Sequence, residues 1–384
     1  MQDGLFELPG RYRELQTEAS ALAADVADLA AEADESGSVH PVMRERLAAS
    51  GLARVTVPRA YGGRLDHVDS LAVTVVREAL AGVSAHLDSL FAMQGIGSYP
   101  ITAGGGPALR QRWLPAVAAC EAIAALALTE PDVGSDLKAI TATIRADGDD
   151  LVVAGHKSFI TNAGDAAFYC VLGREDNGYS LALVPAGGPG VAVTHPHQII
   201  APHVLGDVVL DDVRVPADHR LGPPGQGFRL ALATLATFRV SVAGAAIGLA
   251  QAALNEAVRH ALGRQQFGRP LSEVGPVPVM LARSWTDIEM ARSLTYRAAA
   301  AAARDPLASL HLSSMAKVAA TEMAGQVTDR AVQVMGRFGL VRGSVIERLY
   351  REARPMRIYE GATEVIFDSL ARQLIKAHRA GGTR

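Results

Sequence analysis

The sequence predicts an α+β protein that is mainly helical, with an N-terminal helical lobe, a small β domain and a C-terminal helical bundle. Apolar residues recur at three- and four-residue spacing up to about residue 124, as along one face of a helix. From there to about residue 222 they alternate with polar residues, and turn-forming residues separate the short runs. Helical spacing then returns. The expected domains are residues 1–124, 125–222 and 223–384.

The middle domain is expected to be an antiparallel barrel or sandwich. Residues 141–145 and 151–155 alternate around an Asp-Gly-Asp sequence at 147–149, which is typical of a β-hairpin. Several short strands with turns between them favour a closed or two-layered sheet. Further strands are expected at 168–172, 179–184, 191–194 and 208–210.

The C-terminal domain is expected to be a four-helix bundle. Glycine and proline interrupt its helical pattern between segments that are each long enough for a bundle helix. The expected helices are Phe228–Leu262, Pro276–Ala303, Ser309–Met335 and Thr363–His378.

Composition narrows the class of protein. A net charge of −3 lacks the basic excess of nucleic-acid-binding domains. No apolar run approaches the roughly 20 residues that a membrane span needs, and the N-terminus lacks the features of a secretory signal. The two cysteines give neither a disulfide framework nor a metal-binding spacing. We therefore expect a cytoplasmic protein with no metal and no nucleic-acid or membrane partner.

The sequence Tyr359-Glu360-Gly361 contains a candidate catalytic base. Glu360 lies just before the helix expected from Thr363, where backbone N–H groups have no partner within the helix. A desolvated carboxylate there suits removal of a proton next to a carbonyl, because the free N–H groups can receive the developing oxyanion. The alternative is an acidic residue favoured only by the helix dipole, and this stretch alone does not exclude it.

Two motifs of the middle region, together with the domain order, resemble the acyl-CoA dehydrogenase family of flavoproteins over nearly the whole chain. They are Ala-Leu-Thr-Glu-Pro-Asp-Val-Gly-Ser-Asp at 127–136 and Gly-His-Lys-Ser-Phe-Ile-Thr-Asn-Ala at 155–163. The resemblance implies that FAD is bound by Leu128, Thr129, Ser135, Phe159 and Thr161. Taken singly, the first motif reads as an ordinary turn and Phe159 as a core strand residue.

Later motifs of the same resemblance imply a flavin site shared between subunits. Arg264, Gln266 and Phe267 follow the first bundle helix, and Gln333 and Gly336 end the third. In relatives such residues serve the FAD of a neighbouring subunit, so the resemblance implies a homotetramer, or at least a dimer. Taken alone, Gly336 would simply end a helix.

The last helix and its approach complete the site that the resemblance implies. Glu360 is similar to the catalytic base, and no carboxylate stands at position 238, where some relatives carry theirs. The implied flavin contacts here are Thr363 and Glu364, and the implied substrate contacts are Ser135, Arg239, Tyr359, Gly361 and Arg372.

The implied reaction is FAD-dependent α,β-dehydrogenation of an acyl-CoA thioester. Glu360 would remove the α proton as the β hydrogen leaves as hydride, and an electron-transfer flavoprotein or another acceptor would reoxidise the flavin. Residues 198–206, Pro278 and Arg337 depart from the family pattern, and the first of these could alter how the acyl carrier is held.

Three alternatives to this reaction stay open. An acyl-carrier-protein dehydrogenase of a biosynthetic pathway would share the chemistry but bind a different carrier. A flavin oxidase or monooxygenase of the same fold is less compatible with Glu360, since such relatives generally lack that glutamate. A non-catalytic helical scaffold would bind no flavin.

Overall fold

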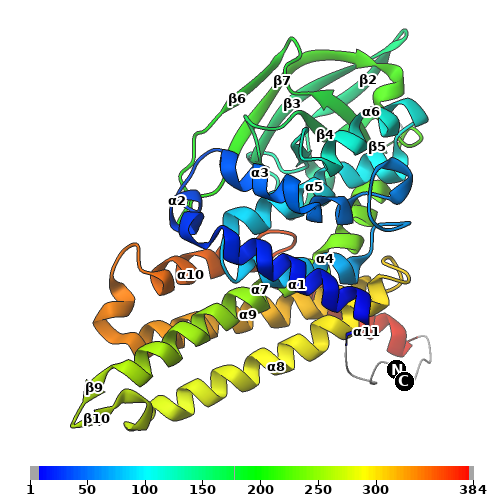
Figure 1. Cartoon of the computed structure of the whole chain (residues 1–384). Coiled ribbons are helices and arrows are strands. Elements are labelled where there is room, and N and C mark those ends of the chain that lie inside the picture. The colour runs from blue at the N-terminus through cyan, green and yellow to red at the C-terminus, as the bar shows by residue number, and fades with distance from the viewer. Residues whose placement is uncertain (1–7, 177, 380–384) are drawn as a thin grey trace.

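A computed structural model describes residues 8–379 with the exception of residue 177. It has the expected three-part architecture, with the β domain at one end and the long bundle helices at the other (Figure 1). The N-terminal residues that we compared with a secretory signal lie outside the described range. The helices of the first lobe are α1 (Gly10–Asp25), α2 (Ala30–Ala33), α3 (Pro41–Ser50), α4 (Ser70–Ala81), α5 (Ala85–Gly104) and α6 (Pro107–Ala118).

Side-chain caps determine where α4 and α5 begin. The Asp69 carboxylate accepts hydrogen bonds from the backbone N–H groups of Leu71 and Ala72. The Ser84 hydroxyl accepts one from the N–H of Leu87. Both residue types are strongly preferred at this position, because they satisfy donors that the first helical turn leaves free. The two caps thereby fix the starting points of the two helices that border the candidate site.

The β domain is one sheet in the order β6-β7-β3-β2-β4-β5-β8, with β1 added beside β4. Most neighbours are antiparallel, as expected. β1 runs parallel to β4, however, and β2 meets β4 in parallel at one residue pair. The strands are β1 (Ala124–Ala127), β2 (Thr143–Asp147), β3 (Asp150–Thr161), β4 (Phe168–Glu175), β5 (Gly178–Pro185), β6 (Val191–Thr194), β7 (Leu205–Pro216) and β8 (Arg220–Leu221).

The four predicted bundle helices agree with the structure to within one residue at each end. They are α7 (Gly227–Gly263), α8 (Val277–Ala302), α9 (Leu310–Met335) and α11 (Thr363–Arg379). A further helix, α10 (Val345–Ala353), was not predicted. The short strands β9 (Gln265–Gln266) and β10 (Arg269–Pro270) pair at the far end of α7.

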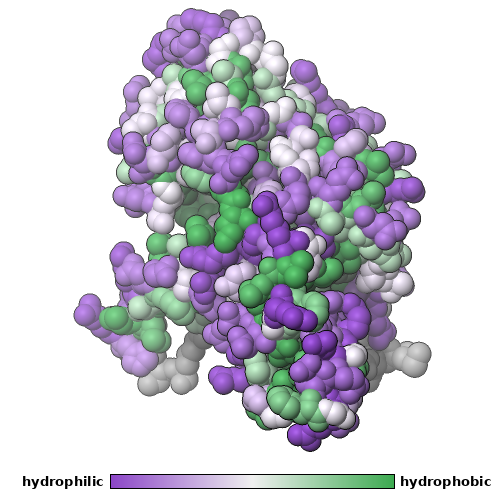
Figure 2. Space-filling view, turned by 90° about the vertical axis from the view of Figure 1, so that its left-hand side faces the viewer, coloured by the Kyte–Doolittle hydropathy of each residue, from purple (hydrophilic) through white to green (hydrophobic). Residues whose placement is uncertain are grey.

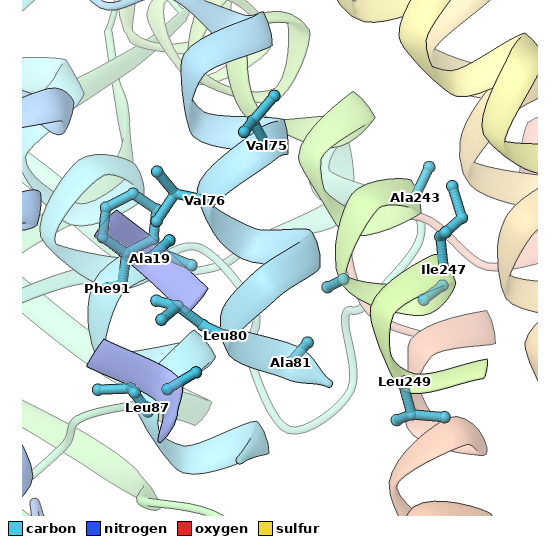
Figure 3. Packing of buried hydrophobic residues seen from close by; sticks show 14 of the residues in the cluster. Ala19, Val75, Val76, Leu80, Ala81, Leu87, Phe91, Ala243, Ile247 and Leu249 are labelled. Carbon is cyan, nitrogen blue, oxygen red and sulfur yellow. The ribbon is translucent and has the colours of Figure 1, made fainter. Parts of the chain in front are cut away.

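Helices α4 and α7 pack so closely that the first lobe and the bundle share one core. Val75 and Leu80 of α4 and Ile247 of α7 belong to one cluster of buried residues. Figure 3 shows α4 and α7 side by side, with Leu80 pointing toward Leu87 and Phe91 and Ile247 on the far side of α7. The contact depends on glycine in α7, because a Cβ atom on Gly248 would lie 1.9 Å from the carbonyl oxygen of Glu78. Gly95 of α5 similarly leaves room for a ring of α7. These contacts fix the relative positions of the helices that surround the candidate site.

Helix α7 corrects one expectation. By length and composition it is apolar enough to cross a membrane, contrary to the prediction that no segment would be. Within its most apolar window, however, 72% of the residues are buried inside the protein. Helix α7 is thus the central helix of the core.

Candidate active site

The connection between α10 and α11 holds Glu360 in an unusual backbone conformation. Its φ angle is +51°, a left-handed value that is uncommon for residues other than glycine, and Gly361 follows with φ of +112°. A Cβ atom on Gly361 would lie 3.1 Å from Cδ1 of Ile366 and 3.4 Å from Nη2 of Arg239. Glycine at 361 therefore allows the chain to turn closely against α7 before α11 begins.

The half-buried Arg239 and the buried Lys317 hold this turn against the bundle. Nε of Arg239, on α7, donates a 3.0 Å hydrogen bond to the carbonyl oxygen of Glu360, and Nη1 donates to the hydroxyl of Ser314 on α9. Nζ of Lys317, also on α9, donates a 2.7 Å hydrogen bond to the carbonyl oxygen of Gly361. Burial lowers the pKa of Lys317 to about 8. Both carbonyl groups of the turn are thus fixed to the bundle.

The Glu360 carboxyl group has the environment expected of a buried base. Although the residue as a whole is half-buried, Oε2 is shielded from solvent and has no hydrogen-bond partner in the described part of the chain. Burial raises the pKa of Glu360, because it removes water from the charged form, and the nearby cations Arg77, Arg239 and Lys317 oppose this shift. The shielded carboxyl is therefore a stronger base, once ionised, than an exposed glutamate.

A buried ion pair of the first lobe contributes to the electrostatic environment of this carboxyl group. Nε and Nη2 of Arg77, on α4, donate hydrogen bonds of 2.9 and 2.7 Å to the two carboxylate oxygens of Asp88 on α5. Nη1 donates a 3.0 Å hydrogen bond to the hydroxyl of Ser241 on α7. All three residues are buried. Of the charges that act on Glu360, that of Arg77 has the largest effect.

The candidate flavin residues of the β domain lie where β1 ends beside β3. The carbonyl oxygen of Thr129 accepts a 3.0 Å hydrogen bond from the N–H of Ser158, and that of Leu128 accepts one from Lys157. Phe159 has a left-handed φ of +56°, and its side chain is 49% exposed and stacks on the His197 ring. Because Phe159 is exposed, it is not the buried core residue that its strand position alone would suggest.

The remaining predicted contacts near the site differ in their surroundings. Ser135 is exposed in the turn after β1, and Thr161 lies at the end of β3. Thr363 is buried and donates a 2.8 Å hydrogen bond to Glu322, whereas Glu364 is exposed. Arg372 is exposed on α11 and pairs with Asp368, so the structure does not bring its side chain to Glu360.

Another group of predicted residues lies at the far end of the bundle. Arg264, Gln266 and Phe267 follow α7, and Gln333 and Gly336 end α9. The Arg264 guanidinium lies 5.5 Å from the ring centre of Phe338, which follows α9. The residues after α7 and those at the end of α9 are therefore close together. Along α7, the rise of 1.5 Å per residue separates Arg264 from Arg239 by roughly 37 Å. The chain therefore carries two separate clusters of predicted flavin residues.

Sequence reasoning missed several polar residues of the site, namely Arg77, Asp88, Ser241 and Lys317. One signal was present: each charged residue interrupts an apolar helical face, as Arg77 does after Val73, Val75 and Val76. A charged residue at a core position needs a partner, since burial of an isolated charge is very costly.

Comparison with known proteins agrees with this fold. Three family models match, described as the acyl-CoA dehydrogenase N-terminal, middle and C-terminal domains, at residues 11–121, 125–213 and 225–375. Together they cover most of the chain. The chain belongs to the acyl-CoA dehydrogenase family.

The similarity to individual relatives extends over nearly the full length of both chains. Cyclohexane-1-carbonyl-CoA dehydrogenase of Geobacter metallireducens is 33% identical over 357 residues, which is 91% of this chain and 93% of that protein. Butyryl-CoA dehydrogenase from Megasphaera elsdenii has a similar structure, with a TM-score of 0.91 and 29% identity, over 96% of this chain and 99% of that one. FkbI, a protein for biosynthesis of a methoxymalonyl extender unit, is 32% identical with a TM-score of 0.83, over 93% and 99% of the two chains.

Proposed function

We propose that the protein is an FAD-dependent dehydrogenase that removes the α and β hydrogens of an acyl-CoA thioester, with Glu360 as the base. The observation that carries this proposal is the state of the Glu360 carboxyl group. It is shielded, has a raised pKa, and projects from a turn whose carbonyl groups are fixed by Arg239 and Lys317. A residue serving only as a helix-terminus charge needs none of these features.

The residues on the β-domain side suit a flavin. Acyl-CoA dehydrogenases bind FAD, and the exposed ring of Phe159 beside the end of β1 offers a flat apolar surface of the kind that packs on a ring system. FAD, when bound, accepts two electrons and the β hydrogen. The residues proposed to hold it are Leu128, Thr129, Ser135, Phe159, Thr161, Thr363 and Glu364.

Glu360 supplies both a base and a hydrogen-bond donor. Its carboxylate takes the α proton, and its own backbone N–H, which donates no hydrogen bond within the described residues, is free to stabilise the developing oxyanion of the thioester. Since burial raises the pKa of Glu360, proton abstraction should increase as the pH rises through that pKa. Arg239, Tyr359 and Gly361 surround this position and are proposed substrate contacts.

We further propose that the protein is a homotetramer, or at least a dimer. The cluster at Arg264 lies roughly 37 Å along α7 from Arg239, which contacts Glu360, so it is too far to complete the flavin site of its own chain but can complete a neighbour's. The bundle also exposes large apolar side chains, including Phe267 at 88%, Leu340 at 75% and Trp285 at 62%. Figure 2 shows hydrophobic residues among hydrophilic ones on one face, including its lower part. A cavity of about 600 Å³ opens between α7 and α8 beside Trp285.

Dehydrogenation of a carrier-protein thioester in a biosynthetic pathway is a second candidate. This candidate is favoured by similarity to FkbI, a protein for biosynthesis of a methoxymalonyl extender unit. It is also favoured by segment 198–206, which departs from the family pattern and could alter how the acyl carrier is held. That segment is held by Arg351, which donates to the carbonyl oxygen of Ile200, and by His203, whose Nε2 lies 3.3 Å from the hydroxyl of Ser89. We further propose that the enzyme is cytoplasmic, which its two free, buried cysteines fit. An electron-transfer flavoprotein or another acceptor is its proposed redox partner.

Stopped-flow flavin reduction by acyl-CoA thioesters tests the proposal in Glu360→Gln. This variant keeps the size of the side chain but cannot accept a proton, so reduction should slow by roughly 10²- to 10⁴-fold while FAD and thioester still bind. Glu45→Gln, at an exposed position of α3, is the matched control and should reduce normally. Reduction of Glu360→Gln at close to the wild-type rate would refute the assignment of the base.

A further inference from the structure

Strand β3 has a bulge at Ser158 and Phe159, where these two residues face the single residue Asp207 of the neighbouring strand β7 (Figure 1). The pairing of the two strands is regular on either side of this point. Phe159 has the left-handed φ of +56°. A bulge interrupts the ladder of backbone hydrogen bonds and re-aims a side chain. This bulge is therefore the local feature that sets the direction of the Phe159 ring.

The carboxylate of Asp207 is the hydrogen-bond partner of the bulge. Its Oδ1 accepts hydrogen bonds of 3.2 Å from the backbone N–H of Phe159 and of 2.8 Å from the hydroxyl of Ser158. Its Oδ2 lies 2.8 Å from Nε2 of His156, and only 5% of the Asp207 side chain is exposed. Burial raises the pKa of Asp207, but the three hydrogen bonds lower it below its usual value. The group is therefore ionised at neutral pH and accepts all three hydrogen bonds.

One face of the Phe159 ring is covered by a neighbouring side chain. The His197 ring stacks on it, with the ring centres 4.7 Å apart and the planes 12° from parallel. Phe159 is nevertheless 49% exposed, so its other face is open. A flat, open apolar surface of this kind suits a second ring system. The direction in which this face points depends on the backbone of the bulge.

The bulge also contacts the turn that follows β1. The backbone N–H of Ser158 donates a 3.0 Å hydrogen bond to the carbonyl oxygen of Thr129, another proposed flavin contact. Ser158 thus bonds to Thr129 through its backbone and to Asp207 through its hydroxyl. Since Asp207 itself is buried, its part is to hold residues that contact a ligand and not to contact the ligand.

A purely structural role for Asp207 is the alternative. A backbone N–H that a bulge leaves unpaired needs an acceptor, and Asp207 provides one for Phe159. That role explains the hydrogen bond. It does not explain why a left-handed backbone holds a large apolar side chain out toward solvent. Residues in such sparsely populated conformations cluster at functional sites.

We propose that Asp207 is a positioning residue of the flavin site, which holds the β3 bulge so that the open face of Phe159 meets the ring system of FAD. The inference rests on the proposed function, because it takes Phe159 as a flavin contact. Asp207 lies outside the two motifs at 127–136 and 155–163. Its carboxylate takes part in no proton or hydride transfer, so its removal should affect the affinity for FAD and the surroundings of the bound flavin.

Titration of the apoprotein with FAD tests the inference. Asp207→Ala removes the acceptor, so the bulge should relax and the Kd for FAD should rise roughly 3- to 10-fold, the value of one aromatic stacking contact. The visible circular dichroism of the bound flavin should change as well, because Phe159 no longer has a fixed direction. Asp207→Asn keeps an acceptor oxygen of the same reach and should bind FAD as the wild type does. An unchanged Kd in Asp207→Ala would overturn the inference.

A double-mutant cycle shows whether Asp207 acts through Phe159. Phe159→Ala alone should weaken FAD binding by a similar factor, and Asp207→Ala in that background should weaken it no further. An equal second loss would mean that Asp207 acts through another part of the site, which contradicts the inference.

A further variant covers the case in which Asp207→Ala does not fold. Threonine suits a strand, but its hydroxyl oxygen is one bond closer to the backbone than a carboxylate oxygen and reaches less far toward the Phe159 N–H. Asp207→Thr should therefore raise the Kd for FAD in the same way. A folded Asp207→Thr protein with the wild-type Kd would count against the inference.

The matched control is Glu175→Ala in the same sheet. Glu175 is largely buried and accepts hydrogen bonds from Ser180 and Arg220. Pairing through β2 places Glu175 level with Val153, about six residues of β3 before Phe159 and thus roughly 20 Å away. This variant should lose stability in urea unfolding but keep the Kd for FAD and the flavin spectrum. The same rise in Kd as in Asp207→Ala would indicate general destabilisation and overturn the inference.

The wild-type titration separates this inference from the proposed function. If the wild type binds no FAD, both fail. If the wild type binds FAD and is reduced by an acyl-CoA thioester, while Asp207→Ala binds FAD equally well, the inference alone is refuted.

Discussion

Gly361→Ala tests whether the backbone of the turn, rather than the Glu360 carboxyl alone, is needed for activity. Gly361 has φ of +112°, a conformation that an alanine rarely adopts, and its Cβ atom would lie 3.1 Å from Ile366 and 3.4 Å from Arg239. The strained conformation costs about 1–3 kcal/mol. Alanine should relieve part of that strain by shifting the turn, which displaces the neighbouring Glu360 carboxyl.

The loss of activity should therefore exceed the loss of stability. A shift of about 1 Å in a reacting group can lower the rate by roughly 10²-fold, so flavin reduction should fall by about that factor. Gly343→Ala is the matched control, because Gly343 has φ of +82° and its Cβ atom would meet nothing within 4 Å. It should lose similar stability in urea unfolding and keep its rate of flavin reduction.

Two results would refute this reasoning. If Gly361→Ala reduces flavin at the wild-type rate, the geometry of the turn does not limit proton transfer. If both variants slow reduction to the same extent, the effect comes from general destabilisation and not from the position of Glu360.

Two further measurements follow from the structure. Glu352 is buried, and its Oε1 has no hydrogen-bond partner among the described residues. Burial raises the pKa of Glu352 well above the ordinary value. The stability that its protonated form contributes is therefore complete below about pH 4.5 and is lost as the pH rises to the folded-state pKa. Glu352→Gln should remove this part of the decline in urea unfolding, and an unchanged pH dependence would contradict the assignment. In sedimentation, the FAD-loaded protein should be a tetramer or at least a dimer, and a monomer that retains FAD tightly would contradict the shared site.

Local sequence pattern was sufficient for the long helices of the bundle. The period of apolar residues located α7, α8, α9 and α11 to within one residue, because long helices repeat the signal many times. Helix α10 was missed since nine residues give only a few repeats. The resemblance to the family identified Glu360, which the structure places in a shielded position.

Partners from distant segments could not be predicted in the same way. Asp88 follows Arg77 by eleven residues on another helix, and Lys317 and Gly361 are separated by 44. Each pairing depends on how the helices pack, which the local period does not specify. The strand ends were also imprecise, because β3 and β7 continue past irregularities in their pairing that alternation does not reveal. The parallel neighbours of β4 depend on the same long-range packing.

The roughly 37 Å of α7 between Arg239 and Arg264 has a consequence for genetics. In the shared-site proposal, one chain gives the base of an active site and its neighbour gives the outer flavin contacts. Two alleles that are each inactive, one altered at Glu360 and one at Arg264, then fail in different halves of the site. When both are expressed in one cell, some mixed oligomers bring the two intact halves together, and part of the lost growth phenotype returns.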